Sequence, residues 1–133
     1  MPRTKSDGRA LTPLELEIMS VLWEAGPANV QAVQERLKSR SLAYTTVQTM
    51  LNVLHRKGKV NRELLDRAYI YRPVLSRQRA VKQALNDLLE RFFAGSADGL
   101  VLNLIQSHRL TPEKLAELQK LVERPREEDH GND

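Results

Sequence analysis

The chain of 133 residues contains no cysteine. Disulfides, thiol catalysis and zinc fingers are therefore excluded, because each of them depends on cysteine sulfur. No segment approaches the roughly 20 consecutive apolar residues that a membrane-spanning helix requires, so we expect no membrane insertion. Residues 1–10 carry basic side chains but no apolar stretch, unlike a signal peptide. We expect a protein of the cytoplasm.

Recognisable catalytic motifs are missing as well. The histidines His55, His108 and His130 are scattered and lack the spacing of metal ligands. The chain has no Gly-rich phosphate loop and no G-x-S-x-G nucleophile motif. We therefore expect neither an enzyme nor a protein that holds a metal or cofactor.

The most informative segment that is present runs from residue 44 to 58. Its apolar residues follow the spacing of one helix face, i, i+3, i+4 and i+7: Val47, Met50, Leu51 and Leu54. The opposite face carries a stripe without any acid: Thr45, Thr49, Asn52 and Arg56. Short uncharged hydrogen-bonding groups suit a helix that enters the major groove of DNA and reaches base edges. By itself the segment fits an ordinary amphipathic helix with a neutral face equally well.

The residues after this helix predict a β-hairpin. Gly58 ends the helix as a C′ residue. Residues 59–65 and 69–73 carry β-formers and are separated by Asp66, Arg67 and Ala68, and Pro73 would end the second strand. A helix followed by a glycine and a hairpin is the winged form of the helix-turn-helix. The alternative is a solvated hairpin with charged edges.

The distribution of charge favours nucleic acid. Residues 36–72 hold nine Lys or Arg against two acids, a net charge of +7, whereas residues 76–133 hold nine bases against ten acids. Such a concentration of positive charge is expected of a surface that contacts phosphates. DNA binding is therefore the preferred interpretation.

Residues 11–75 are predicted to form a mainly α winged helix-turn-helix domain. Thr12, Pro13 and Glu15 form a capping box with proline at the first helical position, and Gly26-Pro27 ends this helix. Its apolar face would consist of Leu14, Ile18, Val21 and Leu22. A second short helix is expected from the cap Asn29 to Ser39, with Val30, Val33 and Leu37 pointing inward.

Residues 76–123 are predicted to form a helical dimerisation domain. A flexible arm (1–10) is expected before the winged-helix domain, and a disordered tail (124–133) after the dimerisation domain. Three short amphipathic helices begin near Ser76, Asp98 and Thr111. Their wide apolar faces have nothing in their own segment to cover them, which favours pairing with a second copy. A single monomeric core is the alternative. The residues expected to mediate dimerisation are Leu85, Leu88, Leu89, Phe92, Leu100, Val101, Leu104, Ile105, Leu115, Leu118 and Leu121.

Three stretches resemble a known family. The segments "LTPLELEIMSVLWEAGPANVQAVQERL" and "AYTTVQTMLNVLHRKGKVNRELLDRAYIYRPV", with "FFAGSADGLVLNLIQSHRLTPEKLAELQKLV" behind them, resemble the penicillinase and methicillin-resistance repressors of the BlaI/MecI type. The resemblance covers residues 11–123. It implies a bacterial homodimeric repressor that binds inverted-repeat operators. It also implies that the matching helix positions, Thr45, Thr46, Gln48 and Thr49, face the operator while the wing touches the DNA backbone.

The same resemblance implies a mode of relief. Some members are cleaved in the C-terminal region downstream of a membrane sensor of β-lactams, and the matching bond here is Asn103–Leu104. The ordinary interpretation of that stretch is core packing. The chain departs from the family pattern at Gln48, at Val53 and in the Asp66-Arg67 turn. The resemblance therefore does not predict which operator sequence the chain binds. A copper-responsive branch uses a cysteine cluster, which this chain lacks.

The sequence thus predicts a dimeric repressor whose partners are operator DNA, a second copy and a membrane sensor protease. The base contacts would be Thr45, Thr46, Gln48, Thr49 and Asn52. The phosphate contacts would be Tyr44, Arg56, Lys57, Lys59, Arg62 and Arg67. The alternative function is a winged helix that binds another protein, with no sequence-specific DNA binding.

Overall fold

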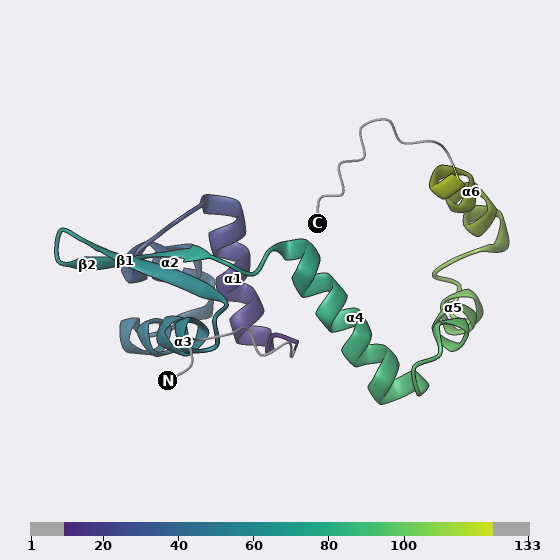
Figure 1. Ribbon diagram of the computed structural model, residues 1–133, viewed down its shortest axis with the longest axis horizontal. Coiled ribbons are helices and arrows are strands. Elements are labelled where there is room, and N and C mark those ends of the chain that lie inside the picture. Colours follow the sequence, from purple (N-terminus) through teal and green to yellow (C-terminus); the bar gives the residue numbers. More distant parts are fainter. Residues whose placement is uncertain (1–9, 124–133) are drawn as a thin grey trace. The chain divides into compact units, whose positions relative to one another are not determined.

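The computed structural model describes residues 10–123, which form two compact units, one ending at Ala84 and one beginning at Leu85 (Figure 1). Residues 1–9 of the predicted arm and the predicted tail lie outside the described residues. The first unit contains α1 (Pro13–Ala25), α2 (Val30–Arg36), the 3-10 turn η1 (Lys38–Arg40), α3 (Tyr44–Arg56), β1 (Val60–Leu65) and β2 (Ala68–Pro73). Helix α4 (Arg77–Phe93) is divided between the two units, and the second unit also contains α5 (Ala97–Gln106) and α6 (Pro112–Glu123). The predicted winged helix is confirmed.

The start of α1 is set by the predicted capping box. The Thr12 hydroxyl accepts a hydrogen bond from the Glu15 N–H at 3.2 Å, and the Glu15 carboxylate accepts one from the Thr12 N–H at 2.9 Å. Gly26 caps the other end with φ +88°, a conformation that favours glycine. The predicted apolar face faces the core, together with Met19, which the prediction missed.

The core of the first unit lies between α1, α2, α3 and the base of the hairpin. On α3 it takes Val47, Leu51 and Leu54, all fully buried, whereas Met50 is only partly buried against it. The second helix is shorter than predicted, because Leu37 caps α2 and the chain continues as η1. Burial of one face of α3 leaves its opposite face to solvent.

The hairpin is a tight antiparallel pair in which Arg62 lies opposite Tyr71 and Leu64 opposite Tyr69. Its two turn residues, Asp66 and Arg67, have φ of +53° and +71°. Two consecutive positive φ values characterise the turn whose twist matches that of the flanking strands. Strand β2 is attached to the loop before α2, since Ala28 and Tyr71 exchange backbone hydrogen bonds of 3.0 and 2.8 Å.

The first unit extends beyond the predicted domain boundary at residue 75. Ala80 on α4 is buried with the core cluster, so the opening turns of α4 belong to the winged-helix unit. The Ser76 hydroxyl caps this helix by accepting a hydrogen bond from the Arg79 N–H at 3.1 Å.

The second unit consists of the three predicted helices. Ser96 caps α5 through the Gly99 N–H at 3.0 Å, and Thr111 caps α6 through the Lys114 N–H at 3.0 Å. Among residues 85–123 no side chain is fully buried, and Phe92 and Leu121 are 68% and 54% exposed. Within this unit the apolar faces therefore stay largely uncovered.

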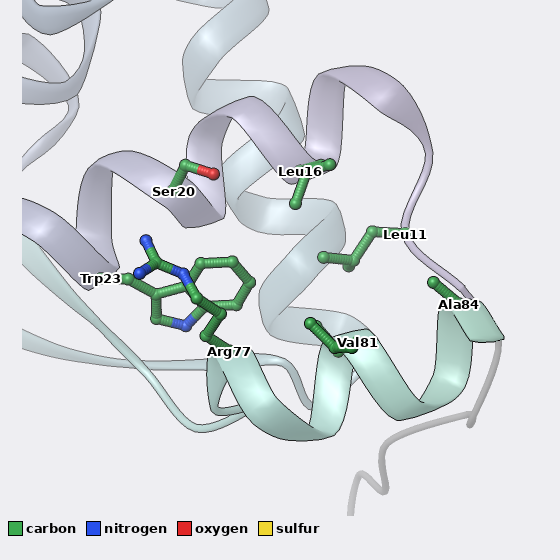
Figure 2. Close-up of a pocket in the computed structure, with 8 residues that line it drawn as sticks. Leu11, Leu16, Ser20, Trp23, Arg77, Val81 and Ala84 are labelled. Carbon is green, nitrogen blue, oxygen red and sulfur yellow. The ribbon is translucent and has the colours of Figure 1, made fainter. Parts of the chain in front are cut away.

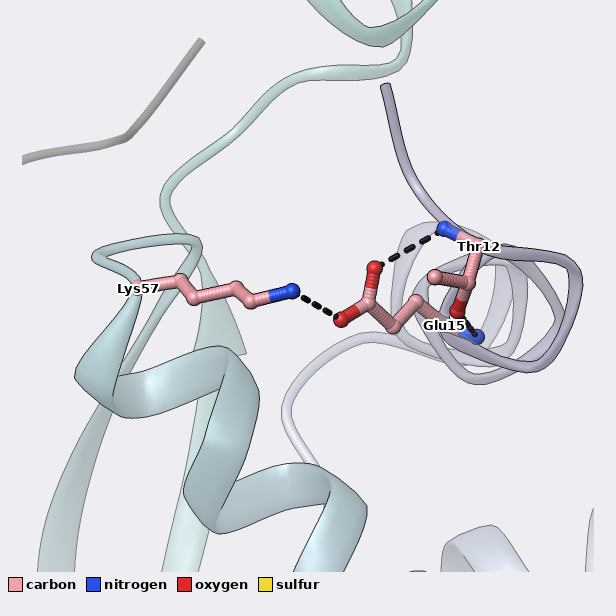
Figure 3. A network of polar contacts seen from close by, with 3 residues as sticks. All are labelled: Thr12, Glu15 and Lys57. Carbon is pink, nitrogen blue, oxygen red and sulfur yellow. Dashed lines mark hydrogen bonds and ion pairs between the residues drawn. The ribbon is translucent and has the colours of Figure 1, made fainter. Parts of the chain in front are cut away.

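A polar pair joins the start of α1 to the end of α3 (Figure 3). The Lys57 ammonium lies 2.7 Å from the second carboxylate oxygen of Glu15, whose side chain is only 2% exposed. Burial acts to raise the pKa of Glu15, but the hydrogen bonds from Lys57 and from the Thr12 N–H and the positive charge of Lys57 outweigh it. The net result is a pKa below the ordinary value of 4.5.

Lys57→Met should weaken the pH dependence that this pair gives to stability. In the wild type the folded-state pKa of Glu15 is lowered. Its stabilisation is therefore present above the unfolded pKa and is lost as the pH falls through the folded pKa. In the variant only the hydrogen bonds of Thr12 still oppose burial, so the folded-state pKa of Glu15 should rise and the stability that is lost on acidification should become smaller. At neutral pH we expect a loss of about 1–3 kcal/mol in the free energy of unfolding.

Urea unfolding followed by circular dichroism across the acidic range measures this effect. Glu15→Gln is the matched control, because glutamine keeps the capping box but does not titrate. A Lys57→Met variant with the same pH dependence as the wild type would contradict the assignment.

Candidate nucleic-acid interface

The solvent-facing side of α3 carries a group of uncharged polar side chains. Thr45, Thr46, Gln48 and Thr49 are all exposed, while Val47 between them is buried. The helical period places these four side chains on the first two turns, where they can donate and accept hydrogen bonds without a charge. The structure therefore brings together four of the five predicted base contacts on one surface.

The fifth, Asn52, lies differently. Its side-chain oxygen accepts a hydrogen bond of 2.8 Å from the Arg62 guanidinium and one of 3.1 Å from the Tyr71 hydroxyl. Asn52 is partly buried, and its side-chain oxygen is occupied by these two donors. It connects α3 to both strands of the wing.

Arg62 completes this connection. Its guanidinium lies 4.2 Å from the centre of the Tyr69 ring while it donates to Asn52. The rings of Tyr69 and Tyr71 are 6.3 Å apart. We call Asn52, Arg62, Tyr69 and Tyr71 the helix–wing interlock. The two tyrosines are not among the predicted site residues, although their alternation on the strand that pairs with that of Arg62 was a usable signal.

Three of the six predicted phosphate contacts are exposed, and the other three, including Arg62, are bound or buried within the protein. Tyr44, Arg56 and Arg67 are exposed and available to a ligand. Lys57 is held by Glu15. The assignment of Lys59 needs correction: its side chain is only 1% exposed, and a side chain packed into the core does not reach a phosphate. Fewer cations thus face outward than the sequence predicts.

A hollow of about 210 Å³ connects the exposed part of α3 with the wing. Gln48 and Tyr44 line it from α3, and Arg67 and Tyr69 line it from the hairpin. Its lining is mainly polar. A predicted base contact and two predicted phosphate contacts therefore share one concave surface.

His55 contributes no charge to this surface at neutral pH. Its partial burial, and then the positive charge of Arg62, lower its pKa below the ordinary value of 6.5. The residue is best understood as a flank of the interlock.

Two further findings concern the described residues, 10–123. No helix among them is long and apolar enough to cross a membrane. They contain no group of three or more His, Cys, Asp or Glu side chains that could hold a metal ion.

Comparison with known proteins gives one consistent result. The penicillinase repressor of Bacillus licheniformis is 29% identical over 114 residues, covering 85% of this chain and 89% of that protein. The transcriptional regulator BlaI of Mycobacterium tuberculosis is 41% identical over 81 residues, 59% of either chain. The solution structure of the DNA-binding domain of the repressor BlaI matches with a TM-score of 0.51 at 29% identity, covering 58% of this chain and 93% of that domain. The family model described as penicillinase repressor matches residues 11–124, and the chain therefore belongs to the penicillinase repressor family.

Proposed function

We propose that this chain is a homodimeric transcriptional repressor that binds inverted-repeat operator DNA through α3 and the wing. The observation that carries the proposal is the exposed, uncharged polar surface of α3, formed by Thr45, Thr46, Gln48 and Thr49. In a family of repressors, a helix with such a surface next to a wing is suited to the major groove.

The wing and the end of α3 would hold this helix on the DNA. Arg56 and Arg67 would contact phosphates from the two flanks, with Tyr44 as an additional hydrogen-bond donor. Asn52 and Arg62 would act mainly by setting the position of the wing relative to α3, because their side chains bind each other.

The second unit would supply the dimer. Its helices expose large apolar side chains that a second copy could cover about a two-fold axis. Two linked half-site binders act at a high effective concentration on a palindromic operator, so separating them releases the DNA without altering α3.

Relief of repression would occur by cleavage between Asn103 and Leu104, carried out in the cytoplasm by a membrane sensor protease that responds to a cell-envelope signal such as a β-lactam. Both residues lie within α5, so the bond becomes accessible only when this helix unwinds locally. Cleavage there would remove the end of α5 and all of α6 from the dimer.

A winged helix that binds another protein is the second candidate, favoured by the exposed side chains of Leu64 and Leu65 near the tip of the wing. Fluorescence anisotropy with a mixed duplex at low and moderate salt separates the two functions. DNA binding that weakens steeply with salt supports the repressor, and no binding at low salt supports the protein-binding alternative.

Thr49→Ala and Arg56→Gln should affect DNA binding in different ways. Thr49→Ala should reduce the preference for an operator fragment over a scrambled duplex, with a cost of about 1–3 kcal/mol for that base contact. Arg56→Gln should weaken binding to both duplexes and flatten the salt dependence by about one unit. Anisotropy titrations at several salt concentrations measure both effects. If the two variants behave identically, this division between base and phosphate contacts is wrong.

Arg62→Lys tests whether Arg62 acts through the interlock. Lysine keeps the charge but loses the planar group that lies on Tyr69 and donates to Asn52. We expect operator affinity to fall about threefold to tenfold with an unchanged salt slope. Arg56→Lys, at an exposed site, is the matched control and should bind nearly as the wild type does. Wild-type affinity in Arg62→Lys would rule out a role of the interlock in DNA binding.

Leu121→Asp tests the dimer. A charge on this exposed apolar position of α6 should separate the two copies, because an unpaired carboxylate would be buried at the interface. We expect a monomer in sedimentation at micromolar concentration and a loss of about a hundredfold or more in affinity for a full operator, with half-site binding unchanged. Gln119→Asp on the same helix is the control. A Leu121→Asp variant that stays dimeric would exclude this face.

A further inference from the structure

A groove lies between α1 and the opening turns of α4, entirely within the first unit (Figure 2). Its volume is about 270 Å³. Figure 2 shows Leu11, Leu16, Val81 and Ala84 around one end of it, with Ser20, Trp23 and Arg77 toward the other. The groove is thus apolar along most of its length and polar at one end.

The walls of this groove are held by contacts within the first unit. The Trp23 indole N–H donates a hydrogen bond of 2.9 Å to the backbone oxygen of Leu75, immediately before α4. Leu75 and Ala80 are both buried with the core. Because this hydrogen bond and the buried Ala80 hold the start of α4 against the first unit, the groove exists before any ligand arrives.

The polar end carries a cation that is weakly engaged. The Arg77 guanidinium lies 5.3 Å from the centre of the Trp23 ring. Its ion pair with Glu24 is long, at 3.9 Å, and the two side chains are 57% and 68% exposed. An ion pair so exposed contributes little to stability. The carboxylate of a ligand can therefore take the place of Glu24 beside Arg77.

We propose that this groove binds a small amphipathic carboxylate, consisting of one aromatic ring or a short aliphatic chain with a terminal acid. The ring would lie among the apolar side chains at the end formed by Leu16, Val81 and Ala84. The carboxylate would accept charge-assisted hydrogen bonds from Arg77, and the Ser20 hydroxyl would donate a further one.

Size and charge select this ligand over others. A cavity of about 150 Å³ accommodates benzene, so the volume here leaves room for a ring with a short chain. A helix, which is about 10 Å across, is too wide for it. A cationic ligand would be repelled by Arg77. The proposal does not depend on operator binding, because the groove uses no residue from the exposed face of α3.

Trp23 makes the groove directly observable, because it is the only tryptophan of the chain. Hydrocinnamate, a phenyl ring with a three-carbon acid, is a suitable probe, and its neutral amide is the matched ligand. We expect a saturable change of tryptophan fluorescence with the full-length protein, with the amide binding about tenfold more weakly than the acid. Isothermal titration calorimetry gives the same affinities independently of the fluorophore.

Three variants complete the experiment. Arg77→Gln should remove the advantage of the acid over the amide, whereas Arg79→Gln, also on the opening turns of α4, should preserve it. Ala84→Phe should fill the apolar end and abolish binding of both ligands, with an unchanged circular dichroism spectrum.

Three outcomes would overturn the proposal. The first is no saturable signal with millimolar hydrocinnamate, and the second is equal affinity for acid and amide. The third is tryptophan fluorescence that ignores both ligands but changes with protein concentration, which would show that a second copy covers the groove.

Discussion

The structure depends on one constraint: α3 must bury one face in the core and leave the opposite face exposed to solvent. Val47, Leu51 and Leu54 pack fully against the other helices and so determine the rotation of α3 about its axis. With 3.6 residues per turn, this rotation presents Thr45, Gln48 and Thr49 to solvent. Packing of apolar side chains therefore selects which polar ones are offered to a ligand.

Two polar connections then hold α3 in place. At its end, Lys57 reaches Glu15 at the start of α1, and at its middle, Asn52 binds Arg62 and Tyr71 of the wing. Both use groups that could otherwise have contacted DNA. Part of the positive charge of this region thus serves the architecture, and the outward-facing charge is smaller than the composition suggests.

Helix α4 belongs to both units, since its first turns pack with α1 and its remainder continues past Ala84. The proposed ligand groove lies along those first turns. The exposed apolar side chains of α5, of α6 and of α4 beyond Ala84 lie in the second unit and fit the proposed pairing with another copy. The two surfaces use different residues and can be altered separately.

Local signals in the sequence determined where the elements begin and end. Thr12 and Glu15, Gly58, and the caps Ser96 and Thr111 act within three or four residues of themselves, so the helices and the hairpin could be predicted closely. Only the tertiary structure decided which polar groups remain outward. Lys57 meets Glu15 across 42 positions of the chain, and Lys59 is buried by the packing of the hairpin base. Periodicity assigns a residue to a face, but whether that face is covered depends on segments that are far away in sequence.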